Sequence, residues 1–61
     1  MWIISKYGMF NANNLVKIFF EDGWTQAVDV SGATVYISPR PAVGDIVEAI
    51  DAGKHKIEVE S

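Results

Sequence analysis

The strongest pattern in the chain is an apolar run, Leu15–Phe20, that leads into a turn sequence. Five of its six residues are large and apolar, and Glu21-Asp22-Gly23 follows directly. Successive side chains of a strand point to opposite faces, so this run places apolar side chains on both faces. A strand of this kind needs cover on both sides. The pattern therefore predicts a strand at the centre of a sheet, ending at a tight turn.

Three further strands are predicted from runs of β-branched and aromatic residues that stop at turn residues. They are Trp2–Tyr7, which stops at Gly8; Trp24–Val30, which follows Asp22-Gly23; and Ala33–Ser38, which follows Ser31-Gly32. The asparagine-rich segment 11–14 favours a turn, since asparagine tolerates left-handed backbone and bonds its own main chain. Together these elements predict a four-stranded antiparallel β-meander.

The two-residue hairpin loop fixes which residues share a face, because the residues flanking such a loop pair with each other. With Glu21 opposite Trp24, the predicted core face is formed by Leu15, Phe19, Trp24, Val28, Val30, Ala33, Val35 and Ile37. The opposite face carries an apolar stripe in a polar surround, formed by Val16, Ile18, Phe20 and Tyr36. A three-residue loop with a bulge would exchange the two faces. An apolar stripe with a polar rim is typical of an interaction surface, and these four residues are the predicted interface.

The last third of the chain predicts a helix and a short final strand. Pro39-Arg40-Pro41 takes the chain out of the sheet, and the apolar residues that follow recur at helical spacing: Val43, Ile46, Val47 and Ile50. A hairpin within residues 46–59 is the alternative, and it would make an all-β small barrel. Lys54–Glu60 alternates and predicts a strand in either case. The predicted fold is α+β: a single domain over residues 1–61, with one C-terminal helix, at residues 42–52, packed on the apolar face of the meander.

Composition narrows the classes of function. The 61 residues include no cysteine and carry a net charge of −3, while 49% of them are hydrophobic. Without cysteine there is no disulfide and no zinc–thiolate site, and the negative charge argues against a nucleic-acid surface. No apolar run approaches the roughly 20 residues of a membrane span, and the N-terminal residues lack the basic segment of a signal peptide. We expect a cytoplasmic protein with no nucleic-acid or membrane partner, stabilised by an efficient core or by self-association.

No combination of residues predicts catalysis, a cofactor or a metal. Asp45, Glu48 and Asp51 lie three residues apart on the predicted helix, a spacing that could hold a divalent cation or support acid–base chemistry. A solvated polar face explains them better. The one histidine, His55, lies on the predicted final strand and suits a packed or edge position. We therefore predict a protein that is not an enzyme.

The opening Trp2-Ile3-Ile4-Ser5, the Asn13-Asn14-Leu15 entry to the apolar run and the closing Asp45–Ile50 segment are similar to small uncharacterised open reading frames of Gram-positive bacteria and their phages or mobile elements. The resemblance implies a source and a size class, and no activity. The expected function is a non-enzymatic protein–protein interaction module, homodimeric or bound to another protein. The alternatives are a small-barrel nucleic-acid-binding protein, an acidic inhibitor of a host nucleic-acid-binding protein, and a hydrolase that uses the helix carboxylates.

Overall fold

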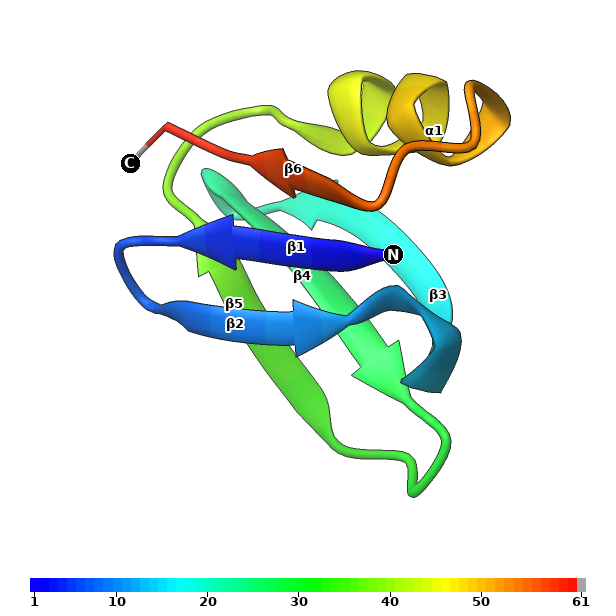
Figure 1. Cartoon of the computed structure of the whole chain (residues 1–61). Helices are drawn as coiled ribbons and strands as arrows, with labels where there is room; N and C mark the ends of the chain where they lie inside the picture. The colour runs from blue at the N-terminus through cyan, green and yellow to red at the C-terminus, as the bar shows by residue number, and fades with distance from the viewer. Residues whose placement is uncertain (61) are drawn as a thin grey trace.

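A computed structural model describes residues 1–60 of the chain as two three-stranded sheets and one helix (Figure 1). The first sheet has the order β2-β1-β6, with β1 at Trp2–Ser5, β2 at Gly8–Asn11 and β6 at Lys56–Glu58. The second has the order β3-β4-β5, with β3 at Leu15–Glu21, β4 at Trp24–Asp29 and β5 at Thr34–Ser38. The helix α1 spans Val43–Asp51, between β5 and β6. The α+β class is confirmed.

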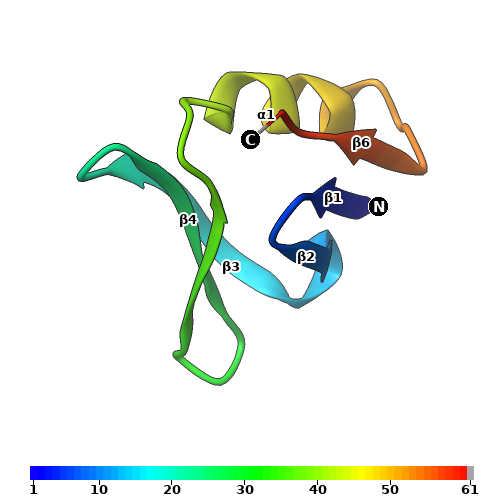
Figure 2. The ribbon, with the colours of Figure 1, turned by 90° about the vertical axis from the view of Figure 1, so that its left-hand side faces the viewer.

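The four-stranded meander is wrong, because the N-terminal segment belongs to a different sheet. The predicted strand Trp2–Tyr7 ends at Ser5, whose hydroxyl accepts a hydrogen bond from the Tyr7 N–H in a tight turn. The chain then returns as β2, which the sequence pattern did not indicate. β1 pairs antiparallel with β2 on one side and parallel with β6 on the other. Figure 2 shows the two sheets as separate layers, with β1 and β2 facing β3, β4 and β5.

As a result, β3 is an edge strand and not the central strand predicted from Leu15–Phe20. The turn predicted at residues 11–14 is present as a short 3-10 helix at Ala12–Asn14. The Asn11 side chain caps it by accepting a hydrogen bond from the Asn13 N–H. This turn directs β3 into the second sheet, where β4 is its neighbour. The other side of β3 pairs with no strand in the described chain.

The hairpin between β3 and β4 has the predicted two-residue loop. Glu21 pairs with Trp24, and the loop residues Asp22 and Gly23 have φ values of 53° and 79°. Positive φ at both positions defines a type I′ turn, whose twist matches that of the flanking strands. Glycine at the second position adopts this backbone without the steric cost that a side chain would bring.

The residues that share a face near this hairpin are those predicted, but the core lies on the opposite face from the one predicted. The register shifts between Leu15 and Lys17, and again where Thr25 and Gln26 of β4 meet Ser38 and Tyr36 of β5. The bulge at Val16 places Leu15 on the core face, and Val35 lies there because it pairs with Ala27. The core face of the second sheet therefore carries Leu15, Ile18, Phe20, Thr25, Ala27, Val35, Ile37 and Ser38. The outer face carries Lys17, Phe19, Glu21, Trp24, Gln26, Val28, Thr34 and Tyr36.

Much of the predicted core is consequently misplaced. Leu15, Val35 and Ile37 do belong to or pack against the core. Three of the other predicted members, Phe19, Trp24 and Val28, lie half-buried on the outer face. The last two, Val30 and Ala33, lie exposed in the turn between β4 and β5.

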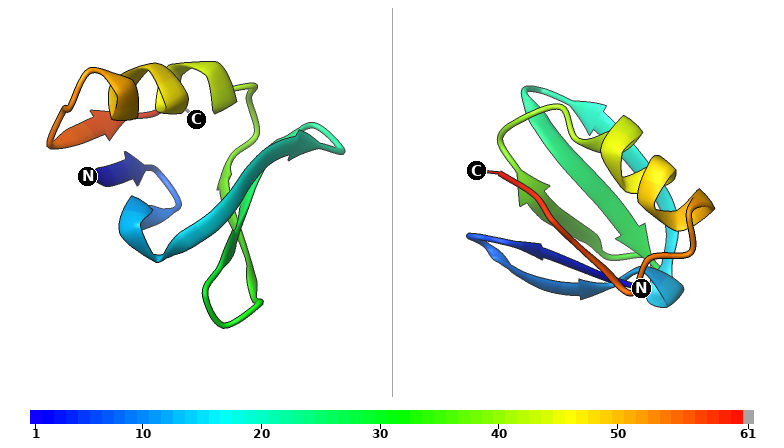
Figure 3. Two further views of the ribbon diagram at one scale, coloured as in Figure 1. Left: turned by 90° about the vertical axis from the view of Figure 1, so that its right-hand side faces the viewer. Right: turned by 45° about the horizontal axis from the view of Figure 1, so that its top comes forward.

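The C-terminal helix is present, so the hairpin alternative and the all-β barrel are wrong. Ile46 and Ala49 form its buried side, and it lies across one end of the space between the two sheets (Figure 3). It lacks a side-chain N-cap because the cap residue, Ala42, has no polar side-chain atom; Ala42 is 4% exposed and belongs to the core. The Ala42 N–H instead donates to the Thr25 hydroxyl oxygen at 2.9 Å. The predicted final strand is present as β6, shorter than expected.

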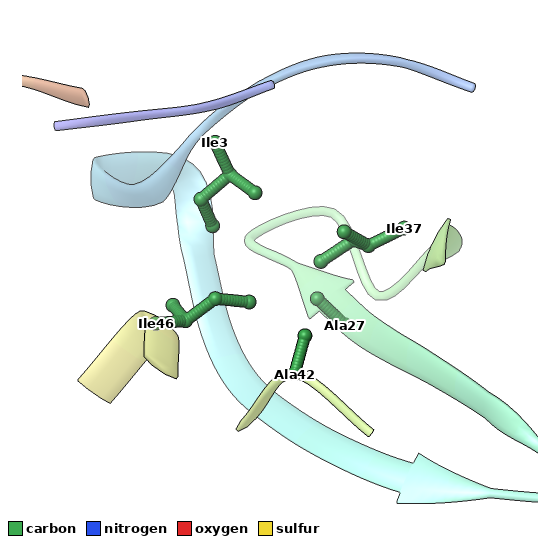
Figure 4. Close-up of a cluster of buried hydrophobic side chains, with 5 residues drawn as sticks. All are labelled: Ile3, Ala27, Ile37, Ala42 and Ile46. Carbon is green, nitrogen blue, oxygen red and sulfur yellow. The ribbon is translucent and has the colours of Figure 1, made fainter. Parts of the chain in front are cut away.

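One apolar cluster joins both sheets and the helix (Figure 4). Its buried members come from five places in the chain: Ile3, Ala27, Ile37, Ala42 and Ile46. Polar groups inside the fold are paired, since no buried side-chain nitrogen or oxygen in the described chain lacks a hydrogen-bond partner. The core is small, and its buried side-chain polar atoms are hydrogen-bonded. β3 packs against it at the edge of the second sheet.

Candidate interaction surface

The free side of β3 exposes backbone hydrogen-bonding groups at two residues, Ile18 and Phe20. In a two-residue hairpin the flanking pair, here Glu21 with Trp24, is hydrogen-bonded, and bonded and non-bonded pairs alternate along the ladder. β4 follows the same alternation, because Asp29 of β4 points its N–H away from β3 and donates it to the Ala33 carbonyl at 2.9 Å. Ile18 and Phe20 therefore direct their N–H and C=O groups away from β4.

These backbone groups have no partner elsewhere in residues 1–60. No hydrogen bond joins Ile18 or Phe20 to the helix or to a loop. An edge strand with unpaired N–H and C=O groups is a template for pairing with another chain. We call the free side of β3, from Lys17 to Glu21, the β3 edge.

The side chains of the β3 edge differ between the two faces. On the core face, Ile18 packs against the apolar cluster, while Phe20 near the hairpin is 47% exposed. On the outer face, Lys17 and Glu21 carry opposite charges on either side of Phe19. The Lys17 Nζ lies 4.9 Å from the centre of the Phe19 ring, within the range of a cation–π contact. The edge is thus apolar on one face and charged at both ends of the other.

The structure does not bring the four predicted interface residues into one surface. Val16 is 66% exposed, at the bulge, and Phe20 is exposed on the core face of β3. Ile18, on that same face, packs against the core. Tyr36 is 53% exposed but lies on the outer face, where it neighbours Gln26. The stripe is therefore divided between two faces, although three of its members belong to β3.

A second exposed apolar feature is an aromatic cluster that the sequence pattern missed. Trp24 makes edge-to-face contacts with Tyr7 and Tyr36, at ring-centroid distances of 5.1 and 5.7 Å. Tyr7 comes from the turn between β1 and β2, so the cluster links the two sheets. Gln26 lies beneath it, 5% exposed, with its side-chain amide donating to the Glu21 carbonyl at 2.8 Å. The sequence analysis does not predict this cluster, because it places Trp24 on the core face.

The acidic residues of the helix do not belong to any group of three metal-ligating side chains in the described chain. Asp45, Glu48 and Asp51 are all exposed, and no group of three metal-ligating side chains occurs within residues 1–60. Hollows of 300 and 310 Å³ flank the helix and β6, and both are lined by Asp45, Ile57 and Glu58. Neither hollow contains a nucleophile beside a base. His55 is exposed, and its carbonyl accepts a hydrogen bond from the Trp2 N–H.

Comparison of the chain with family models, with curated proteins and with solved structures finds no match. Within the described residues, α1 is far too short to cross a membrane and no other α-helix is present. The surface of the molecule is therefore the basis for assigning a function, and the β3 edge is its most distinctive feature.

Proposed function

We propose that this protein is a non-enzymatic protein–protein interaction module that associates with a second copy of itself through the β3 edge. The observation that carries the proposal is the pair of unpaired backbone positions, Ile18 and Phe20, on a strand with exposed apolar side chains. Pairing two such edges gives both copies the hydrogen bonds that each lacks. A twofold arrangement is the commonest form of self-association, since one patch serves both partners.

The other sheet edges are less suited to pairing. β6 has three residues and β2 has four, whereas β3 has seven. β5 offers Thr34 and Tyr36 to the solvent, and its first residue is polar. Natural edge strands resist pairing by being short or by carrying lysine or proline. Among the four edges, β3 is the longest, and its single lysine lies at one end of the exposed stretch.

Self-association is tested by measuring mass in solution. Light scattering and sedimentation at micromolar concentrations should give a dimer, about twice the 6.7 kDa of the single chain. A Phe20→Pro variant should be monomeric, because proline removes the outward N–H without breaking a bond to β4. The matched control is Thr34→Pro, which alters the equivalent outward position on β5 and should leave the dimer intact.

Circular dichroism shows whether each proline variant keeps its fold. A wild-type mass of 6.7 kDa throughout the micromolar range would overturn the proposal. A dimer that persists in Phe20→Pro, with the fold retained, would show that the association does not depend on β3.

A second candidate function follows from the aromatic cluster of Tyr7, Trp24 and Tyr36. Exposed rings on a sheet can stack against the bases of single-stranded nucleic acid. Only Lys6 and Arg40 lie within four residues of these rings in the sequence, and the chain has a net charge of −3, which favours protein association instead. Quenching of tryptophan fluorescence by an oligothymidine, abolished by Trp24→Leu and weakened by salt, would support this candidate. Quenching that persists in Trp24→Leu would dismiss it.

A further inference from the structure

We infer, on the basis of the self-association proposed above, that two copies pair antiparallel along β3 in a single register centred on Phe19. In this register Lys17 of each copy lies opposite the partner's Glu21, and Ile18 lies opposite the partner's Phe20. The twofold axis passes between the two Phe19 residues. The two three-stranded sheets become one six-stranded sheet, with the outer faces of both copies on the same side.

The backbone restricts the register before any side chain is considered. The free N–H and C=O groups of the β3 edge belong to Ile18 and Phe20, whereas Lys17, Phe19 and Glu21 bond to β4. Outward residues must therefore pair with outward residues. Pairing Ile18 with the partner's Phe20 satisfies this requirement twice, by symmetry, and makes about four hydrogen bonds between the copies. A shift by one residue would leave these groups without partners.

Charge then selects among the registers that the backbone permits. Centred on Phe19, the pairing places two lysine–glutamate pairs on the outer face, one on each side of the axis. The Lys17 Nζ lies over the Phe19 ring, on the same outer face as the partner's Glu21 in this register. Opposite charges at directly paired positions stabilise a sheet, and like charges there destabilise it.

The neighbouring permitted registers lose these pairs. Centring on Ile18 would place Glu21 opposite the partner's Leu15 and would run the pairing into the bulge at Val16. Centring on Phe20 would pair Ile18 with the partner's Asp22, which lies in the hairpin turn with a φ of 53°. The Phe19 register alone keeps the paired segment within regular strand and matches its charges.

A charge exchange tests the register. Lys17→Glu and Glu21→Lys should each raise the dimer dissociation constant about tenfold or more, since each variant makes two like-charge pairs. The double variant restores opposite charges, and its constant should return to within about threefold of the wild type. Both positions are exposed, so the fold should survive. Glu48→Lys makes the same change of charge on the outside of the helix and should leave the constant unchanged.

Cysteine cross-linking gives an independent measure, because the natural chain has no cysteine. In this register residue 17 of one copy lies opposite residue 21 of the partner. A mixture of the Lys17→Cys and Glu21→Cys variants in oxidised glutathione should therefore form a disulfide between one copy of each variant. Either variant alone should cross-link far more slowly. Fast cross-linking of one variant with itself would overturn the register.

The outcomes separate this inference from the proposed function. A wild-type dimer that is insensitive to all three charge variants overturns the register and leaves self-association standing. A monomeric wild type overturns both. Weakening by each single variant with recovery in the double variant supports the pairing as described.

Discussion

At the scale of single residues, Thr25 shows how one buried hydroxyl holds the helix against the second sheet. Its side chain is fully buried, donates to the Arg40 carbonyl at 2.5 Å and accepts from the Ala42 N–H at 2.9 Å. These bonds hold the segment that leads into α1, whose first turn has no side-chain cap. The segment between β5 and the helix, which contains two prolines, is therefore fixed by a residue of β4.

Replacing Thr25 with valine should destabilise the fold by about 1–3 kcal/mol, because two buried backbone groups lose their partner while the shape is kept. Urea unfolding at one fixed protein concentration measures the change. Thr34→Val is the matched control, since Thr34 is exposed on β5 and should change stability by less than about 0.5 kcal/mol. Equal effects at the two positions would show that the Thr25 bonds contribute nothing.

Asp29 organises the turn between β4 and β5 in a comparable way. Its carboxylate accepts hydrogen bonds from the Ser31 hydroxyl at 2.6 Å and from the N–H groups of Ser31 and Ala33. The Ser31 hydroxyl bond lowers the pKa of Asp29 below its ordinary value of 3.8; partial burial opposes this shift, and hydrogen bonds from backbone N–H groups support it. The turn thus favours the ionised carboxylate.

The pH dependence follows from the sign of that shift. A carboxylate whose folded-state pKa is depressed stabilises the fold above its unfolded pKa, near 3.8, and this stabilisation is lost as the pH falls through the folded value. NMR titration should place the Asp29 midpoint below 3.8, and Ser31→Ala should move it upward. A midpoint that does not respond to Ser31→Ala would show that the hydroxyl is not the main cause.

At the scale of elements, the parts of the fold that local patterns determine were predictable. The strand 15–21, the two-residue hairpin and the helix each have a signal within a few residues: an apolar run, an Asp-Gly pair and a helical spacing. The bulges at Val16 and Ile37 have no such signal, because one extra residue in a strand leaves the composition unchanged. The predicted core face was wrong while its strands were right, because both faces of the β3–β4 hairpin carry large apolar side chains and the choice between them depends on where the first sheet packs.

The candidate site was predictable only in part for the same reason. The apolar character of Val16, Ile18 and Phe20 indicates a place in one strand, and all three lie on β3. The symmetric arrangement of Lys17 and Glu21 about Phe19 is also visible in the sequence. This arrangement indicates a pairing register only when β3 is known to be an edge strand. That depends on the pairing of β1 with β6, more than 50 residues apart in the chain, instead of with β3. Contacts of that range are not encoded in any local pattern.

The helix provides an element-scale test of which residues face the core. Ile46 is fully buried whereas its neighbour Val47 is 54% exposed. Ile46→Ala should destabilise the fold by about 2–5 kcal/mol, and Val47→Ala by less than about 1 kcal/mol. Chemical denaturation of the two variants at equal concentration makes the comparison. A larger effect at Val47 would mean that the helix is rotated or that Val47 is covered by a partner.

At the scale of the whole molecule, the core is small. The fully or nearly fully buried apolar residues in the described chain are three isoleucines and three alanines: Ile3, Ala27, Ile37, Ala42, Ile46 and Ala49. Domains of about 60 residues have little stability to spare, and the chain has neither a disulfide nor a group of metal ligands in residues 1–60. Phe20 is 47% exposed, and the exposed part of its ring adds nothing to the stability of a single copy. Pairing through the β3 edge would couple the stability of the fold to its concentration.

This coupling gives the last prediction. A partner that binds only the folded chain stabilises it by mass action, so the melting temperature of a self-associating protein rises with its own concentration. For a domain this small, each 1 kcal/mol of stabilisation corresponds to about 4–8 °C, and a hundredfold increase in concentration should raise the melting temperature by several degrees. The Phe20→Pro variant is the control, because a folded monomer melts at a temperature that does not depend on concentration. If the wild type behaved like that variant, then the small core would be sufficient by itself, and the β3 edge would remain unpaired in solution.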